Sequence, residues 1–422
     1  MSVLLASAAN PAVGVVIFML GGLAGAVFYM PLKKVKNWAW ESYWMIYAFF
    51  ALLIVPCVLA FFVSPNVISA ISSTETKTLT YCFLCGAAWG LGGLTWGLMI
   101  RFLGVGLGLA LGCGLCSAAG TLIPKILDGE FGQLLKPGSG LTSLVGVVVS
   151  IVGIVFVGLA GMSKESELSE EEKKKTVAEF NFKLGIIAVL FSGLMSASLN
   201  FGLQGGPEIA YKAQYGSETK IVKIDSVSPN AVPQELTANP KSFKDNNSGY
   251  WVAPGAPVGE RLTTATWSGI PVLVVALLGG FVINAGWCLI LNIKNKTTGD
   301  YAKKGAPNGA NLFFAALAGA IWCSQFICFK TAEPQMGNTA YVGWAVLMAS
   351  AILFSQLLGL MLGEWKGTSK KTMQLLFAGP VLLILSAFVA GYSGYLGQQE
   401  KETSSVPQLP HVEIIEPAAP AM

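Results

Sequence analysis

The chain has 422 residues and a net charge of +4; 53% of its residues are hydrophobic, 12% are charged, and the mean hydropathy is +0.61. Ordinary globular proteins carry about 25% charged residues, and a soluble chain this apolar could not cover its surface with polar groups. The composition therefore excludes a soluble globular protein and predicts an all-α polytopic membrane protein.

Apolar runs long enough to cross a membrane, about 20 residues each, recur along the whole chain. We predict ten transmembrane helices, at residues 12–30, 43–63, 80–100, 102–123, 141–161, 183–203, 267–293, 310–330, 341–363 and 373–395. Lysine and arginine are enriched in cytoplasmic loops, and most of them fall here in the alternate loops 31–42, 101, 162–183, 294–309 and 364–372. We therefore place these loops in the cytoplasm, and both termini and the long loop 204–266 on the other side.

Glycines at helical spacing run through residues 86–112, on both sides of Arg101. They are Gly86, Gly90, Gly93 and Gly97 before it, and Gly104, Gly108 and Gly112 after it. In lipid such glycines let helix backbones touch, because membrane helices associate by close packing. Trp89 and Trp96 lie two turns apart beside this face, at mid-span rather than at the water interface where membrane tryptophans are common. We predict two tightly packed, short-linked helices, with both indoles placed to line a cavity.

The charged segment KESELSEEEKKKTVAE lies in a cytoplasmic linker, residues 162–182, that divides the ten helices into two sets of five. These sets are residues 1–161 and 183–395. An odd number of helices per half inverts the second half in the membrane, the arrangement of many transporters. Gly86-Ala-Ala-Trp89 and Gly319-Ala-Ile-Trp322 occupy equivalent places in the two halves, which favours two inverted five-helix repeats.

Two polar segments lie outside the predicted helices. Loop 204–266 is rich in proline and glycine, and we expect in it short strands around residues 219–227 and 249–253. Residues 396–422 contain four prolines and are predicted to form a disordered tail.

Few ionisable groups fall within or near the predicted helices. The single histidine, His411, is in the tail, so a proton-coupled mechanism requires a carboxylate; Glu41, Glu333 and Glu364 lie near helix ends. A carboxylate buried in the membrane holds its proton more readily, as a proton carrier must. The alternative interpretation of each glutamate is an ordinary charge at the membrane interface.

The remaining polar side chains indicate binding rather than catalysis. Asn200, Asn284, Gln325 and Gln356 are amides at membrane depth that either bridge helices or bind a polyol. The pairs Cys82-x-x-Cys85 and Cys113-x-x-Cys116 resemble a zinc pattern but lie in apolar spans, where cysteine behaves as a small hydrophobe. No phosphate-binding loop, helical His-Glu-x-x-His pair or hydrolytic carboxylate pair is present. We expect no enzyme, no cofactor, no metal and no nucleic-acid partner.

Residues 28–44, FYMPLKKVKNWAWESYW, closely resemble the first cytoplasmic loop of the L-rhamnose–proton symporters, a branch of the drug/metabolite transporter superfamily. The motif positions matched in this block are Phe28, Tyr29, Pro31, Lys33, Lys34, Val35, Lys36, Trp38, Trp40 and Glu41. Further matches run from Gly86 to Glu364-Trp365 and touch nearly every predicted helix. The resemblance implies ten helices in inverted five-helix repeats and inward transport of L-rhamnose with protons across a bacterial inner membrane.

The chain departs from the family pattern in three places. Gly92-Gly93-Leu94-Thr95 replaces an asparagine-rich stretch, residues 326–330 replace a usual tyrosine, and loop 204–266 is longer. The first two touch the expected sugar cavity, so a related deoxy-sugar is an alternative substrate.

Together these observations assign candidate roles. The expected sugar-binding residues are Tyr29, Trp89, Trp96, Asn200, Asn284, Trp322 and Gln325. Indole faces suit the apolar face and methyl group of a deoxyhexose, and amides suit its hydroxyls. Glu41 is the first candidate for the coupling proton and Glu333 the second, while Arg101 positions the turn after the third helix or pairs with a carboxylate.

The expected partners are the sugar, the proton and the lipid bilayer; the oligomeric state stays open. Three alternative functions also stay open at this point. They are a metabolite exporter or exchanger of the same superfamily, a sugar receptor that does not transport, and a membrane enzyme that uses the cysteine pairs.

Overall fold

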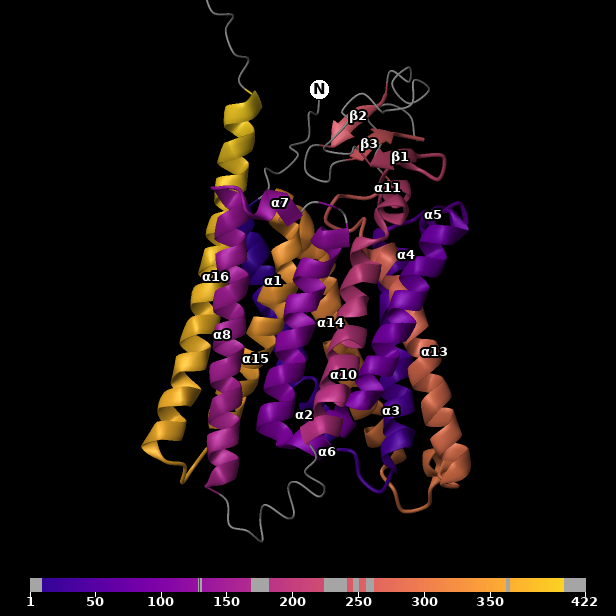
Figure 1. Ribbon diagram of the computed structural model, residues 1–422. Helices are drawn as coiled ribbons and strands as arrows, with labels where there is room; N and C mark the ends of the chain where they lie inside the picture. The colour runs from indigo at the N-terminus through magenta and orange to yellow at the C-terminus, as the bar shows by residue number, and fades with distance from the viewer. Residues whose placement is uncertain are drawn as a thin grey trace, which may run out of the picture.

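The computed structural model describes residues 10–127, 129, 131–167, 182–223, 241–245, 250–255, 262–361 and 365–405. Some side chains within these ranges, including those of residues 97, 101 and 103–110, lie outside the description. The chain forms a bundle of long, roughly parallel helices with a small β-sheet at one end (Figure 1). The predicted all-α membrane class is therefore confirmed at this level, because eight helical stretches among the described residues are long and apolar enough to cross a membrane.

In the described residues of the first half, all regular elements are helices. Its elements are α1 (Pro11–Val27), α2 (Tyr29–Leu32), α3 (Trp40–Phe49), the π-helical turn η1 (Phe50–Ile54), α4 (Val55–Val63), α5 (Val67–Ser72), α6 (Thr76–Leu127), α7 (Phe131–Leu134) and α8 (Ser139–Ser166). α3, η1 and α4 form one continuous span. The π-helical turn comes just before Pro56, which cannot donate a backbone hydrogen bond to the residue four positions earlier.

The second half contains the sheet. Its elements are α10 (Phe182–Gln204), α11 (Pro207–Tyr215), β1 (Lys220–Lys223), β2 (Phe243–Asp245), β3 (Tyr250–Ala253), α13 (Ile270–Lys294), the 3-10 helix η2 (Thr298–Ala302), α14 (Asn308–Met336), η3 (Gly337–Val342), α15 (Gly343–Met361) and α16 (Lys370–Ser405).

Helix α6 folds back on itself. The Met99 sulfur lies 2.5 Å from where a Cβ on Gly112 would be, yet residues 13 apart on a straight helix are separated by about 20 Å. Trp96 and Met99 also share an apolar cluster with Leu111 and Leu115. α6 therefore consists of a first limb, residues 76–99, and a second limb, residues 111–127, reversing where the sequence predicts a short link.

Close glycine contacts join the two halves. A Cβ on Gly86 of the first limb would clash with the backbone of Ala276 in α13. A Cβ on Gly22 of α1 would clash with the backbone around Ser350 in α15. α1 packs against α14 and α15, and α10 packs against α6. These contacts hold the bundle together by backbone proximity, as expected for helices in lipid.

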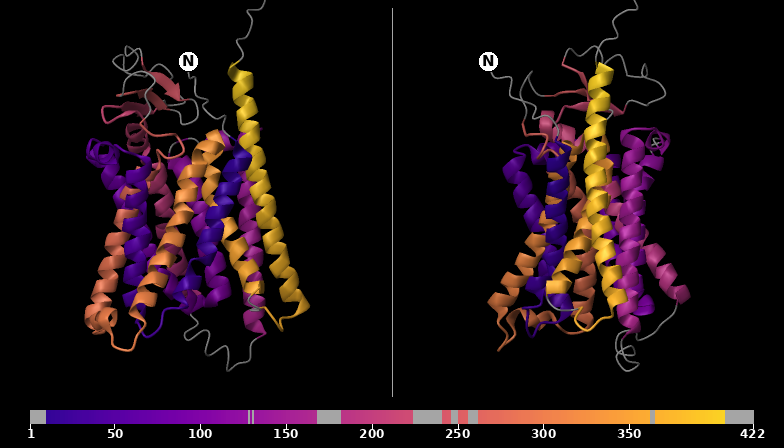
Figure 2. Two further views of the ribbon diagram at one scale, coloured as in Figure 1. Left: turned by 180° about the vertical axis from the view of Figure 1, so that it is seen from behind. Right: turned by 90° about the vertical axis from the view of Figure 1, so that its left-hand side faces the viewer.

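α8 and α16 lie side by side (Figures 1 and 2) and cap one another. Glu400 near the end of α16 accepts hydrogen bonds from the backbone and hydroxyl of Ser139, the first residue of α8, at 2.7 and 2.5 Å. Glu167, just past the end of α8, accepts the equivalent bonds from Ser369, the residue before α16, at 2.8 and 2.5 Å. Each carboxylate satisfies free donors at the start of the partner helix.

The bundle has two distinct ends. The sheet end carries the three strands, the start of α1 and the end of α16, and the linker end carries the end of α8 and the start of α10 (Figure 1). The sheet has the antiparallel order β1-β3-β2, with Lys220 opposite Ala253. The strands expected around residues 219–227 and 249–253 are confirmed by β1 and β3.

The predicted start of the tail at residue 396 is wrong, because α16 continues to Ser405. Apolar positions of this helix contact α8 and α15, and the helical conformation persists beyond the last apolar run. Residues 406–422 and residues 168–181 of the predicted linker lie outside the described residues.

Candidate functional site

Aromatic rings from three helices, α3, α6 and α14, meet inside the bundle. Trp322 of α14 lies 5.3 Å from Trp89 of α6, 6.2 Å from Tyr47 of α3 and 4.7 Å from Phe326, measured between ring centroids. Tyr47 in turn lies 4.6 Å from Trp44. We call Trp44, Tyr47, Trp89, Trp322 and Phe326 the central aromatic cluster. Two of its members, Trp89 and Trp322, are the indoles of the repeated Gly-Ala-x-Trp motif.

The glycine of each motif explains how its indole comes to this place. A Cβ on Gly319 would clash with the backbone of Tyr47 and Ala51, so α14 contacts the α3–η1 span directly. Gly86 contacts α13 in the same way, three residues before Trp89. In both helices the tryptophan lies almost one turn after the glycine, and the two indoles face each other.

Three of the predicted amides are buried between helices, and one of them, Asn284, contacts the cluster. The Asn284 side chain accepts a hydrogen bond from the Trp44 indole at 3.2 Å and donates one to the Gly280 carbonyl at 3.0 Å. Gln325 is buried, and its amide packs against Gly25 of α1. Asn200 of α10 donates to the Gly120 carbonyl at 2.6 Å. All three side chains are therefore positioned by neighbouring helices rather than exposed to lipid.

The other two predicted sugar-binding residues lie apart from the cluster. Trp96 donates a hydrogen bond to the Ser196 hydroxyl at 2.7 Å and packs with Met99 near the reversal of α6. Tyr29 begins α2 at the linker end and is 44% exposed. The structure thus brings Trp89, Trp322 and Asn284 together, with Gln325 next to Phe326 on α14. Asn200 lies against Gly120, and Trp96 and Tyr29 lie apart from the cluster.

Hydroxyl groups near Asn200 were missed by the sequence reasoning. Ser117 and Thr121 are fully buried, and their hydroxyls, like the Asn200 side-chain oxygen, have no hydrogen-bond partner in the described part of the chain. Ser117 and Thr121 are four residues apart on the second limb and share a face. Buried polar atoms are normally bonded, so these three mark a position where a polar ligand would gain bonds. The four-residue spacing of Ser117 and Thr121, which places both hydroxyls on one helix face, was the signal in the sequence that could have identified them.

Glu41, in the first turn of α3, is held in a polar contact with the segment after α13 at the linker end. Its side chain accepts hydrogen bonds from Asn295 at 2.9 Å and from Thr297 at 2.8 Å. The next residue, Ser42, donates to Asp300 at 2.9 Å. Asp300 also accepts from the Ala39 backbone at 2.6 Å. Every donor to Glu41 in this description is neutral, and the bonds connect the start of α3 to the segment after α13.

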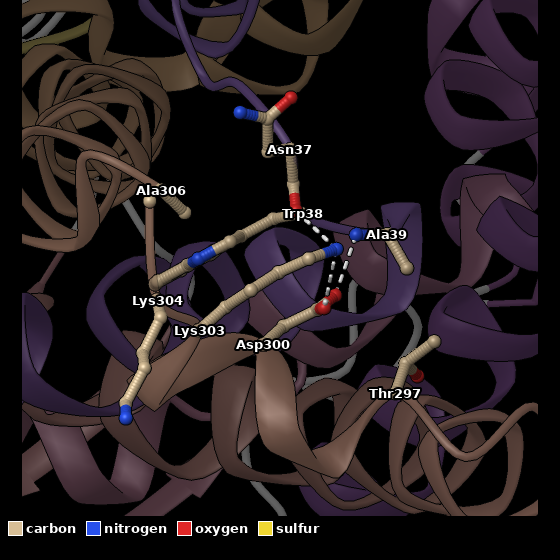
Figure 3. A pocket seen from close by; sticks show the side chains of 9 residues that line it. Asn37, Trp38, Ala39, Thr297, Asp300, Lys303, Lys304 and Ala306 are labelled. Atoms are coloured by element: carbon tan, nitrogen blue, oxygen red, sulfur yellow. Dashed lines mark hydrogen bonds and ion pairs between the residues drawn. The ribbon is translucent and has the colours of Figure 1, made fainter.

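A cavity of about 400 Å³ adjoins this contact. Figure 3 shows Lys303 between the Asn37 carbonyl, at 3.0 Å, and Asp300, at 3.6 Å. Trp38 is fixed by a 3.0 Å bond from its indole to Asn308. The motif that carries the resemblance, residues 28–44, is therefore attached to the loop between α13 and α14.

Glu333 has a different environment at the sheet end. It accepts a hydrogen bond from Lys330, one turn earlier on α14, in an ion pair whose side chains are 16% and 8% exposed. Lys330 also donates to the Leu203 carbonyl at the end of α10, at 3.2 Å. This pair connects α14 to α10 inside the membrane-spanning region, where ionisable residues usually have a function.

The prediction of close helix contacts at the glycines is confirmed at some positions and wrong at another. Gly86 and Gly90 are at close helix contacts, with α13 in both cases. The prediction for Gly93 is wrong, because a Cβ there would meet nothing within 4 Å; its helix face turns away from α13 and α10 at that level. The surroundings of Gly97, Arg101, Gly104 and Gly108 lie outside the described side chains.

The cysteine pairs form no recognisable site. All eight cysteines are free thiols, and no group of three metal-binding side chains occurs among the residues that the structure describes. The Cys116 carbonyl accepts a bond from the Trp344 indole at 3.2 Å, and Cys82 packs in an apolar cluster with Ile209 and Val272.

Comparison with known families decides the classification. The profile described as L-rhamnose-proton symport protein matches residues 8–227 and 259–395. The chain belongs to the L-rhamnose-proton symport family. The predicted resemblance is thereby confirmed, and this is a family of transporters, not of enzymes.

Curated members of the L-rhamnose-proton symport family align over nearly the whole chain. The L-rhamnose-proton symporter of Mannheimia succiniciproducens is 29% identical over 382 residues, which are 90% of this chain and 96% of the relative. The L-rhamnose-proton symporters of Pectobacterium atrosepticum and Yersinia pestis are each 28% identical over the same shares. The family match omits residues 228–258, which include β2 and β3.

Proposed function

We propose that this protein imports L-rhamnose, or a related deoxy-sugar, together with protons across a bacterial inner membrane. The observation that carries the proposal is the pair of facing indoles, Trp89 and Trp322, within membrane-spanning helices that also bury amide side chains. Family membership and the printed names of the aligned relatives support the same substrate and coupling ion.

We propose that the ten predicted spans form two inverted repeats, residues 1–161 and 183–395. Eight stretches are long and apolar enough to cross the membrane, and the two limbs of α6 would supply two further crossings. Two pairs of equivalent contacts favour the symmetry: the Gly86 and Gly319 contacts, and the reciprocal caps of α8 and α16. In such transporters the substrate binds near the membrane midplane, between the repeats.

The sugar would lie against the central aromatic cluster. The indoles of Trp89 and Trp322 supply flat apolar faces for the ring and methyl group of a deoxyhexose. The hydroxyls would bond to Asn284, Gln325 and the partnerless oxygen of Asn200, with Ser117 and Thr121 as additional candidates. A site built to bond hydroxyls rejects analogues that lack them. Trp96 and Tyr29 would approach the sugar only after a conformational change.

For the coupling proton we place Glu333 before Glu41. Protonation of Glu333 removes its charge, weakens its bond to Lys330, and so loosens the connection between α14 and α10. A proton arriving from outside the cell would then change how these helices pack, and coupling needs only two conformations that bind proton and sugar differently. Glu41 bonds to neutral groups at the opposite end and serves better as a positioning group.

The decisive experiment is uptake by purified protein in liposomes, with a panel of labelled sugars under an imposed pH gradient. The proposal predicts accumulation of L-rhamnose that disappears when the gradient is abolished. Accumulation of another deoxy-sugar alone would reassign the substrate. Exchange without accumulation would favour an exchanger, and binding without either would favour a receptor.

A further inference from the structure

The sheet above the bundle is firmly fixed to the membrane helices. Tyr211 of α11 donates a hydrogen bond to Asp245 of β2 at 2.6 Å. α11 in turn is tied to the two residues that flank α5. Asn66 donates to the Lys212 carbonyl at 3.0 Å, and the Lys212 amine donates to the Ser73 carbonyl at 2.5 Å. Two of its three strands fall in residues 228–258, which the family profile omits. Strands β2 and β3 therefore lie outside the part of the chain that matches the family, and specific bonds hold the sheet in place.

A cavity of about 650 Å³ lies between this sheet and the ends of the helices. β1 and β3 form one side, and the start of α6, the end of α10 and α11 form the other. The volume falls within the range of about 300–1,000 Å³ typical of small-molecule sites.

The wall of the cavity has the composition of a site for a neutral polyol. It contains two carboxylates and two amines, so their charges balance; these are Glu75, Glu208, Lys212 and Lys220. Glu208 is fixed by bonds from the Glu75 backbone at 3.1 Å and the Thr78 hydroxyl at 3.0 Å, and by an ion pair with Lys212 at 2.9 Å. The rings of Tyr81 and Tyr250, the amide of Gln204 and apolar side chains such as Leu127 and Ile221 form the rest of the wall. Balanced charge disfavours an ionic ligand, whereas fixed polar groups beside aromatic rings suit a sugar.

The cavity also adjoins the interior site. Gln204 lies one helical turn after Asn200 on α10, on the same face. Phe201, between them, lines the cavity and packs against the large apolar core that contains Trp322. A ligand in the cavity is thus separated from the buried oxygen of Asn200 by about one turn of α10.

We propose that this cavity is an outer saccharide site, which binds a neutral monosaccharide before it passes to the central aromatic cluster. The inference rests on the proposed function, since it takes the sheet end as the outer side and a sugar as the substrate. It adds a second binding site, contributed in part by a segment outside the common family fold.

The test fills the cavity. Val222→Trp on β1 places a bulky ring in the wall, and Lys244→Trp on β2, an exposed position outside the cavity, is the matched control. Uptake of labelled L-rhamnose is measured in right-side-out vesicles, and binding to purified protein by equilibrium dialysis. We expect Val222→Trp to raise the KM for uptake about tenfold, the equivalent of one lost polar contact, with kcat unchanged. Binding should fall from two sugars per chain to one.

Gln204→Leu, which keeps the side-chain volume, should shift KM in the same direction and covers the case of a misfolded Val222→Trp protein. An unchanged KM and a single binding site in the wild type would overturn the outer site while leaving transport intact. A wild-type protein that neither binds nor accumulates any neutral sugar would overturn the proposed function itself, and the outer site with it.

Discussion

Two carboxylates mark opposite ends of the bundle, Glu41 buried and Glu333 partly buried, and their surroundings differ. Glu41 at the linker end accepts bonds from Asn295 and Thr297, and these bonds join the start of α3 to the segment after α13. Glu333 at the sheet end pairs with a lysine, and that lysine joins two membrane helices. Protonating Glu41 would weaken two hydrogen bonds from neutral donors, whereas protonating Glu333 would remove the ion pair with Lys330. The comparison teaches that burial alone does not identify a proton carrier; the charge of its partner matters.

The largest expected effect comes from breaking the ion pair on one side. Lys330→Met leaves Glu333 buried without its cation, which should lower the free energy of unfolding by about 3–5 kcal/mol. Thermal unfolding in detergent measures it. The double variant Lys330→Met/Glu333→Gln removes both charges and should recover most of the loss. Equal stability of the single and double variants would contradict the description of Glu333 as a charged partner.

The central aromatic cluster should dominate sugar binding. Trp322→Ala removes the ring that touches Trp89, Tyr47 and Phe326, and we expect kcat/KM for uptake to fall about a hundredfold, or about 2.8 kcal/mol. Trp322→Phe retains an aromatic face and should recover part of the activity. The matched control is Trp287→Ala on α13, whose side chain is 45% exposed. If the control loses as much as Trp322→Ala, the cluster is not the sugar site.

The Glu41 contact should show a smaller effect on stability. Thr297→Val deletes one hydrogen bond to Glu41, and the expected loss is about 1 kcal/mol. Thr298→Val, at the neighbouring exposed position, should change nothing. Uptake driven by a pH gradient should persist in both variants. A Thr297→Val protein that is fully stable but uncoupled would return Glu41 to first place as the proton carrier.

The smallest effect concerns the caps of α8 and α16. Hydrogen bonds from Ser369 and Thr372 hold the pKa of the Glu167 carboxyl below its ordinary value. A lowered pKa in the folded state stabilises the protein above the unfolded value, near pH 4.3, and the contribution is lost as the pH falls through the folded pKa. Glu167→Gln should therefore lower the melting temperature slightly at pH 7 and not at pH 3. A difference that persists at pH 3 would contradict this assignment.

Much of the fold could be predicted from sequence, because hydrophobic length and lysine placement are strong signals in membrane proteins. The span predicted at 12–30 matches α1 closely, and the reversal of α6 falls near Arg101 as expected. The repeated Gly-Ala-x-Trp motif identified the two indoles that meet at the centre. This contact could be predicted because both tryptophans lie in the same four-residue motif.

The remaining features depend on partners far apart in the chain. The burial of Ser117 and Thr121 without partners reflects packing around α10, which their apolar neighbours do not reveal. Gly93 has the same spacing as Gly86 and Gly90, but its face of the helix meets no neighbour, whereas the adjacent Gly92 lies against Ser196 of α10. The bonds of Glu41 come from residues about 250 positions later. Periodicity predicts which residues share a face, and not what the face contacts.

The most direct test of the account compares Glu333→Gln with Glu41→Gln in liposomes. Each protein is assayed for L-rhamnose accumulation driven by a pH gradient and for counterflow between equal sugar pools. The account predicts that Glu333→Gln abolishes accumulation yet retains counterflow, because glutamine mimics the protonated acid, and that Glu41→Gln accumulates sugar. Accumulation by Glu333→Gln together with its loss in Glu41→Gln would contradict the account and assign the coupling proton to Glu41.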